Sequence, residues 1–217
     1  MSTLATLAVK VFSIGTAFTF AGGIAALSAF SVPELQSQPA SRSLPSVRWL
    51  FSRGSHIFPQ AGTASSAGFC YLAYQALPTT SGVLSLLNVG ANGRVVNGYL
   101  LAAALVIGIG PVTGIMLPIV NIPLIQLTED LGGARSQASA EYSNQGGKTA
   151  MESISGKGDI SEFTDLSNPQ TETARPSTAG EDARARELLA TFGWMNAARS
   201  VLMLVGGIVG LGVALGA

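Results

Sequence analysis

Residues 95–120 read VVNGYLLAAALVIGIGPVTGIMLPIV and contain no charged side chain. A helix needs about 20 mostly apolar residues to cross the hydrocarbon of a bilayer, so we predict that this segment spans a membrane. The segment 57–77 is also uncharged but more polar, and we expect it to face neighbouring helices more than lipid. In all, four spans are predicted, at about 8–30, 57–77, 95–120 and 188–216.

The composition of the whole chain agrees with a membrane protein. Charged residues make up 11% of the sequence and the mean hydropathy is +0.42, whereas soluble domains contain about 25% charged residues. We predict an all-α fold, an integral membrane four-helix bundle formed by residues 1–130 plus 183–217. Residues 131–182 are rich in Ser, Thr, Gly, Glu and Gln, and we expect them to form a long, largely disordered loop between helices 3 and 4.

The distribution of charge predicts how the chain is oriented. Eleven of the twelve acidic residues lie between Glu129 and Glu187, and no basic run is suited to nucleic acid. Arginines in the expected loop Ser31–Ser55, together with Arg135, Arg184 and Arg186 close to the helix ends at the expected long loop, place both long loops in the cytosol by the positive-inside rule. We therefore expect a multi-pass protein of an endomembrane. The first apolar segment could instead be a cleaved signal peptide, although its length favours retention as a span.

Single cysteine and histidine residues limit the metal chemistry. Cys70 cannot form an internal disulfide, and with His56 alone a two-histidine metal site within one chain is excluded. We expect no metal and no cofactor.

Glycines recur at a spacing of four in the predicted spans. This spacing lets helix backbones approach closely inside a membrane. It fits packing within the bundle, and alternatively a homo-oligomer formed through the Gly-rich spans. The three pairs are Gly206 with Gly210, Gly212 with Gly216, and Gly110 with Gly114.

Arg199 lies inside the last predicted span. A guanidinium at that depth costs about 2.5–3.5 kcal/mol, so it needs a partner or a wet cavity. Helix-end carbonyls or Glu34 could supply the partner. The functional alternative is a site for an anionic oxygen, at which Arg199 would be a fixed positive charge. Asn196 lies three residues earlier on the same helical face and could donate to the same oxygen or to a neighbouring helix.

Two other polar residues lie near helix ends. Asn121 stands between Pro118 and Pro123, where it could bond carbonyls freed by the prolines or take part in chemistry. His56 is the side chain expected to titrate near neutral pH, and it could be solvated or could act as a base.

Short motifs in a fixed order resemble those of the anthrone oxygenase-like family, small four-span membrane proteins of polyketide pathways. A Pro-containing turn follows the first span, and an aromatic-x-x-Gly-x-x-x-x-Pro element follows the turn. A Met-x-Pro-x-x-Asn-x-x-Leu element closes the third span, and a Trp-x-Asn-x-x-Arg element opens the last. The residues are Ser31, Val32 and Pro33; Phe51, Gly54 and Pro59; Met116, Pro118, Asn121 and Leu124; and Trp194, Asn196 and Arg199.

The resemblance implies a cofactor-independent oxygenase that converts an anthrone-type aromatic polyketide to a quinone, with dioxygen as co-substrate. Deprotonation gives an electron-rich anthranolate that reacts with dioxygen directly. Arg199 and Asn196 would stabilise the enolate oxygen, Asn121 would orient the second oxygen, and His56 would take the proton. The expected substrate-binding residues are Trp194, Trp49, Phe51 and Met116.

A non-catalytic alternative remains open at this point. A membrane carrier or scaffold for hydrophobic metabolites would keep the pocket and Arg199 but would need no base. In either case the expected partners are a hydrophobic aromatic small molecule and the lipid bilayer, with no nucleic acid.

Overall fold

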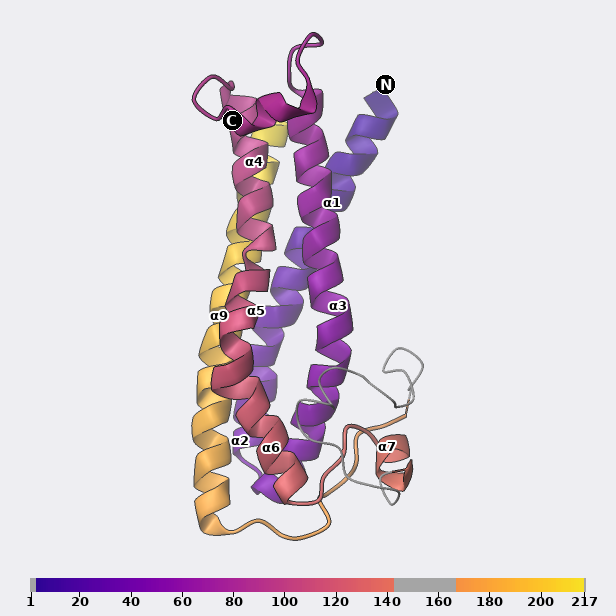
Figure 1. Ribbon diagram of the computed structural model, residues 1–217, viewed down its shortest axis with the longest axis vertical. Coiled ribbons are helices and arrows are strands. Elements are labelled where there is room, and N and C mark those ends of the chain that lie inside the picture. Colours follow the sequence, from indigo (N-terminus) through magenta and orange to yellow (C-terminus); the bar gives the residue numbers. More distant parts are fainter. Residues whose placement is uncertain (1–2, 143–166, 217) are drawn as a thin grey trace. The chain divides into compact units, whose positions relative to one another are not determined.

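The computed structural model describes residues 3–142 and 167–216, and every element of secondary structure in these ranges is helical (Figure 1). The prediction of an all-α fold is therefore confirmed. Two π-turns (η1 and η3) and one 3-10 turn (η2) interrupt or connect the α-helices of these ranges. The elements are α1 Thr3–Ala26, η1 Leu27–Ser31, α2 Val32–Gln36, α3 Ala40–Gln75, η2 Val83–Leu87, α4 Arg94–Ile107, α5 Ile109–Met116, η3 Leu117–Asn121, α6 Ile122–Asp130, α7 Gln137–Tyr142 and α9 Ala179–Leu215.

Three helical runs are long and apolar enough to cross a membrane, namely Leu4–Gln36, Arg94–Asp130 and Ala179–Leu215. They contain 33, 37 and 37 residues, and the hydrocarbon of a bilayer needs only about 20. Each run is therefore longer than a single crossing needs. α3, with 36 residues, is the fourth long helix. Its polar composition keeps it out of this group, and its crossing of the membrane stays a prediction.

The prediction of a polar loop at Ser31–Ser55 is wrong. α2 continues the first helical run to Gln36 and α3 begins at Ala40, so only residues 37–39 separate two helices. Hydropathy identifies segments that suit lipid, whereas a polar stretch can be helical wherever other surfaces cover it. The serines and arginines of this stretch therefore extend a helix instead of ending one.

Both π-turns precede a proline by the same spacing. η1 ends two residues before Pro33, and η3 ends two residues before Pro123. In each turn, the N–H of the next residue donates to the carbonyl five residues earlier. A proline lacks the N–H and crowds the carbonyl four residues before it. The wider π-turn removes that conflict, so the helical run continues through the proline.

The chain divides into two compact units. Unit 1 comprises residues 1–25, 58–112 and 197–217, and unit 2 comprises residues 26–57 and 113–196. Each unit contains a piece of all four long helical runs.

The core of unit 1 combines one large ring with many small side chains. Phe69 is fully buried and stacks on Tyr99, with the ring centroids 6.3 Å apart. Alanines from α1 and α4 let the backbones lie close together. The buried members are Ala17, Ala21, Ile24, Phe69, Leu72, Ala73, Val96, Tyr99, Ala102, Ala103, Val106, Ile109 and Met203.

Glycines of α9 have two different surroundings in unit 1. A Cβ on Gly206 would lie 2.6 Å from Val106 Cγ2, and one on Gly210 would overlap the Phe69 ring. These two glycines therefore serve packing within the unit. A Cβ on Gly212 would meet nothing within 4 Å. Association of chains through the Gly-rich spans stays a prediction.

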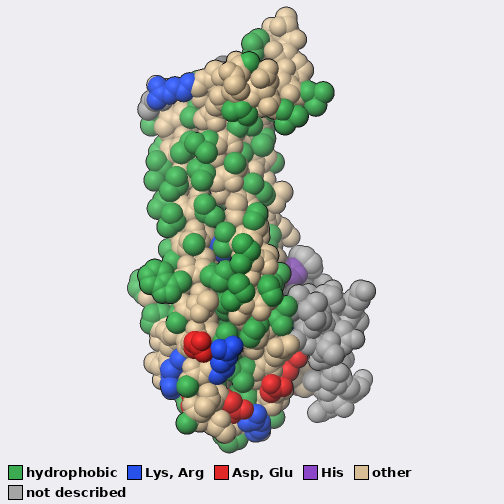
Figure 2. All heavy atoms as spheres, turned by 60° about the vertical axis from the view of Figure 1, so that its left-hand side comes forward, with side chains coloured by type: hydrophobic (Ala, Val, Ile, Leu, Met, Phe, Trp, Pro, Cys, Tyr) green, Lys and Arg blue, Asp and Glu red, His purple; other side chains and the backbone are tan. Residues whose placement is uncertain are grey.

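The core of unit 2 contains larger aliphatic side chains from α2, α3, α5 to α6 and α9. Figure 2 shows acidic and basic side chains gathered at the end of this unit formed by α2, α6 and the first turns of α9. The buried members are Val32, Leu35, Ala40, Leu44, Val47, Met116, Val120, Leu124, Leu131, Ala185, Leu188, Leu189 and Phe192.

The long connection between α6 and α9 is structured in both of its described parts. The N–H of Gln137 donates to Asn168 O at 2.9 Å, and the N–H of Thr173 donates to Ser41 O at 2.8 Å. The described parts therefore pack against each other and against α3. The prediction of a largely disordered loop at 131–182 is therefore wrong for residues 131–142 and 167–182, and the rest of it falls on residues 143–166, which lie outside the described residues.

Candidate functional site

The predicted site residues are divided between the two units. Arg199 belongs to unit 1 and the other seven belong to unit 2. We describe each unit's residues in turn. The seven in unit 2 are Asn196, His56, Asn121, Trp194, Trp49, Phe51 and Met116.

Arg199 is buried in unit 1, with 7% of its surface exposed. Its Cζ lies 5.9 Å from the ring centroid of Phe58, and Phe20 meets that ring edge-on, with the centroids 6.0 Å apart. A guanidinium over an aromatic face is attracted by the ring quadrupole, more strongly when it is desolvated. Arg199 takes part in a further interaction as well. An aromatic ring is thus a partner for this charge that the sequence did not suggest.

Asn196 lies one helical turn before Arg199 on α9 and is fully buried. Its Nδ2 donates to Phe192 O at 3.0 Å, which uses one of its two amide hydrogens. The donor that we expected to face substrate is therefore partly engaged within its own helix.

Asn121 is the residue of unit 2 that points most directly to a ligand. It ends η3, and its side chain does not cap the following α6. Its Oδ1 is buried and accepts no hydrogen bond from the described residues. A buried acceptor without a donor costs about 1–3 kcal/mol. An O–H group of a bound molecule would satisfy this oxygen.

His56 is half-buried near the middle of α3, and its contacts define a tautomer. Nδ1 lies 2.8 Å from Ser52 O and 2.9 Å from Ser55 Oγ. A carbonyl oxygen can only accept, so Nδ1 carries the hydrogen in the neutral ring. Nε2 is then the nitrogen with the lone pair, and it is the one that could take a proton.

Trp49 forms a hydrogen bond to the connection between α7 and α9. Its Nε1 donates to Ser167 O at 2.9 Å, and Arg53 Nη2 reaches the same oxygen at 3.3 Å. Arg53 Cζ also lies 5.1 Å from the Trp49 ring centroid. One face of the indole is therefore covered by a guanidinium. A substrate could therefore stack only on the opposite face of the Trp49 ring, and this role stays a prediction.

The remaining predicted residues differ in burial. Met116 is fully buried in the core of unit 2, and Phe51 packs on Phe192 with the ring centroids 5.1 Å apart. Trp194 has 79% of its surface exposed. This exposure favours Trp194 as an anchor at a membrane interface, because indole rings prefer that region.

Two buried arginines were not predicted as such. Arg48 and Arg135 are each 4% exposed, and neither is without an interaction partner. The sequence placed both in loops, where they counted only toward orientation. Burial of a charge in this way is specified by tertiary packing, and no local pattern would have revealed it.

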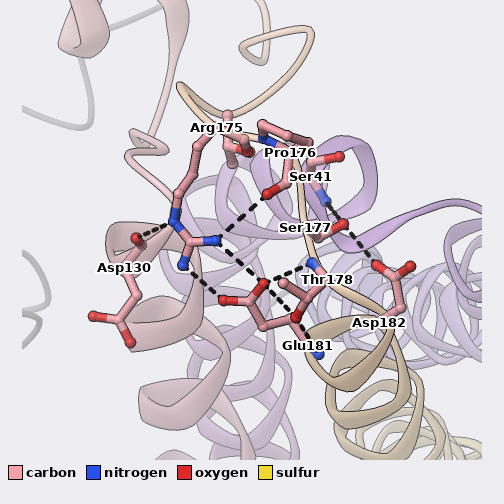
Figure 3. Close-up of polar contacts among 9 residues, drawn as sticks. Ser41, Asp130, Arg175, Pro176, Ser177, Thr178, Glu181 and Asp182 are labelled. Atoms are coloured by element: carbon pink, nitrogen blue, oxygen red, sulfur yellow. Dashed lines mark hydrogen bonds and ion pairs between the residues drawn. The ribbon is translucent and has the colours of Figure 1, made fainter.

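A polar cluster fixes the start of α9, the helix that carries Asn196 (Figure 3). Arg175 donates to both carboxylate oxygens of Glu181, at 2.6 and 3.2 Å, and its Nε donates to Asp130 O at 3.3 Å. The N–H of Thr178 donates to Glu181 Oε2 at 2.7 Å, and the N–H of Glu181 donates to Thr178 Oγ1 at 3.3 Å. Thr178 and Glu181 therefore form a capping box.

The same cluster lowers the pKa of one carboxylate and caps a second helix. Glu181 lies in the first turn of α9, before its apolar part, and the hydrogen bond from Arg175, followed by those from Thr178, lowers the pKa of Glu181 to about 2. Asp182 Oδ1 accepts from the N–H of Ala40 at 2.7 Å and from Ser177 Oγ at 2.7 Å. Residues of α9 thereby cap the N-terminus of α3.

No group of three His, Cys, Asp or Glu side chains in residues 3–142 and 167–216 could hold a metal ion. The expectation of a reaction without metal or cofactor stays a prediction.

Comparison with known proteins gives one finding. A family model described as anthrone oxygenase matches residues 48–209, well over half of the 217 residues. The matched range contains all eight predicted site residues, and the resemblance drawn from the ordered motifs is confirmed. No curated protein and no solved structure matches the chain.

Proposed function

The chain belongs to the anthrone oxygenase family, and from this premise we propose that it oxidises an anthrone-type aromatic polyketide to a quinone with dioxygen. The reaction replaces the two hydrogens of the substrate's methylene carbon by one oxygen atom. Removal of one proton gives the anthranolate, which forms a C–O bond with dioxygen. Protonation gives a hydroperoxide. Loss of the second C–H proton and cleavage of the O–O bond then release water and leave the carbonyl.

The buried Asn121 Oδ1 is the observation that carries this proposal beyond family membership. An anthrone in its enol form and the hydroperoxide both offer an O–H donor. Either would pair with this oxygen, which accepts no hydrogen bond from the described residues. Asn121 therefore orients an oxygen atom of the substrate or of the intermediate.

His56 and Arg199 have different tasks. His56 takes the proton from the methylene carbon. Arg199 supplies a fixed positive charge for the enolate oxygen. Phe51 and Met116 supply apolar contact for a flat substrate.

The reaction is tested with membranes that contain the protein, supplied with emodin anthrone and ¹⁸O₂. We expect oxygen uptake above the spontaneous rate, one labelled oxygen atom in the quinone and one in water. Substrate binding with no oxygen uptake above that rate would show the carrier or scaffold alternative to be correct instead.

Asn121→Ala is expected to lower kcat/KM about tenfold, through loss of one hydrogen bond to the substrate. Asn88→Ala is the matched control, because Asn88 is exposed in unit 1. Equal loss of activity in both variants would remove the proposed role of Asn121.

Arg199→Ala is expected to lower kcat about 10²-fold, the effect of losing one group that stabilises an oxyanion. Arg184→Ala is the control on the same helix, because Arg184 is half-exposed and pairs only with Glu187 in the contacts we describe. A double variant with Asn121→Ala measures whether the two residues act on the same step, since independent effects multiply.

The protein lies in an endomembrane, and the long connection after α6 faces the cytosol. Arg135, Arg184 and Arg186 support this orientation by the positive-inside rule. In unit 1, the start of α1, the end of α9 and the α3–α4 connection lie at the same end (Figure 1), as an even number of spans requires. Accessibility of single introduced cysteines in sealed vesicles tests the orientation.

A further inference from the structure

The connection between α3 and α4 exposes a compact group of aliphatic side chains. Residues 76–93 contain no charged residue. Within them, Leu84 and Leu87 are 77% and 80% exposed, and Val83 and Val89 are 63% and 57% exposed. We name these four residues the apolar cap. Single exposed aliphatic residues are normal on a protein, but four within seven positions form an apolar patch of the kind that contacts a partner or a membrane.

The segment that carries the apolar cap is held in a defined orientation. Leu86 packs against the core of unit 1, so η2 has an inner side. Asn92 Nδ2 donates to Leu86 O at 3.2 Å. Asn97, in the first turn of α4, donates through Nδ2 to Val89 O at 2.9 Å. The outward direction of the apolar cap is therefore fixed by the fold.

The position of the apolar cap points to lipid as its cover. α4 follows directly and begins the apolar run Arg94–Asp130, which is long enough to cross a membrane. The uncharged segment 95–120 of this run starts directly after Arg94, so the start of α4 is expected at the membrane interface. Arg94 follows Val89 by five residues and is exposed, so its guanidinium can reach lipid phosphates at the same interface.

A second copy of the chain fits less well. Four aliphatic side chains expose on the order of a few hundred Å², whereas a specific interface buries at least about 1,200 Å² in total. A five-residue 3-10 turn cannot supply the remaining area by itself.

We propose that the apolar cap, Val83, Leu84, Leu87 and Val89, inserts into the boundary between headgroups and acyl chains of the adjacent leaflet. It anchors the end of unit 1 in the manner of an interfacial helix, with Arg94 at the phosphates. This proposal is independent of the reaction proposed above.

The test uses single-cysteine variants in which Cys70, the one native cysteine, is replaced by serine. Leu84→Cys, Leu87→Cys and the control Thr80→Cys are labelled with an environment-sensitive fluorophore and reconstituted into phosphatidylcholine vesicles. Thr80 belongs to the same connection and is exposed. Elution of each variant at the same volume as the parent protein in size-exclusion chromatography confirms that the variant is folded.

We expect lipids with a nitroxide near the headgroup to quench the labels at 84 and 87 about threefold more than the label at 80. Aqueous iodide should quench the label at 80 most. Equal access of iodide to all three labels would overturn the proposal. Self-quenching at 84 and 87 that grows with the ratio of protein to lipid would also overturn it, because that outcome indicates a second copy.

Discussion

Unit 1 and unit 2 contain pieces of the same four helical runs, yet different interactions hold the pieces together. Unit 1 relies on small residues and on serines that donate to carbonyls of neighbouring helices, as Ser65 Oγ does to Ser13 O at 2.8 Å. Unit 2 relies on larger aliphatic side chains and on charged caps such as Asp182.

The contrast indicates where chemistry can be accommodated. Close backbone packing among the small residues of unit 1 leaves little room for a ligand beside them. Unit 2 contains both π-turns and the buried Asn121 Oδ1 without a donor. π-Turns often occur at functional sites, because they move side chains away from the regular helical positions.

Gly210→Leu should have the largest effect on the packing of unit 1. A Cβ at this position overlaps the Phe69 ring, which is itself fully buried and cannot move outward. We expect a loss of about 1–3 kcal/mol in the free energy of unfolding, measured by thermal unfolding in detergent. Gly212→Leu on the same helix should change little, because a Cβ there meets nothing within 4 Å. Similar losses in the two variants would contradict the packing described for unit 1.

Asp182→Ala should have the next largest effect, and it acts on unit 2. The substitution removes the acceptor for the Ala40 N–H and for Ser177 Oγ. Loss of a helix cap destabilises by about 0.5–2 kcal/mol. Glu187→Ala is the control, because Glu187 makes only an exposed pair with Arg184 in the contacts described here, and such pairs contribute about 0–1 kcal/mol. If the control loses as much stability as Asp182→Ala, the capping role is wrong.

The sequence could predict the helices of unit 1 better than those of unit 2. Apolar runs reveal segments that lie in lipid, and they located the four long helices. The same criterion assigned Ser31–Ser55 to a loop, because arginines and serines are unfavourable in lipid but compatible with a helix in other surroundings.

Some features of the candidate site had a local signal and others had none. Thr178 and Glu181 follow the Ser/Thr-x-x-Glu pattern of a capping box, which could have been recognised. The contact between Asp182 and Ala40 joins positions 142 residues apart. The ring of Phe58 over Arg199 is also a product of tertiary packing. No spacing in a single sequence encodes such contacts.

Ser66→Ala should have a smaller effect on unit 1 than the glycine substitution. Ser66 Oγ donates to Ala103 O at 3.1 Å, from α3 to α4. Hydrogen bonds between membrane helices contribute about 0.6 kcal/mol on average, so we expect a loss of that order in the free energy of unfolding. Thr63→Ala is the control, because Thr63 Oγ1 donates to Pro59 O within its own helix. A loss above that of Gly210→Leu would mean that polar contacts, and not close packing, dominate unit 1.

Glu181→Gln should have the smallest effect, and the effect should depend on pH. The pKa of Glu181 is lowered from 4.5 to about 2 by Arg175 and Thr178, so folding favours the carboxylate. The stabilisation is therefore present above about pH 4.5 and is lost as the pH falls toward 2. Thermal unfolding between pH 7 and pH 3 should show the parent protein and Glu181→Gln converging as the pH falls. Glu187→Gln is the control, because the Glu187 side chain forms an exposed pair with Arg184 in the contacts described here. A gap between Glu181→Gln and the parent that does not narrow in acid would show that the capping box of unit 2 acts without its charge.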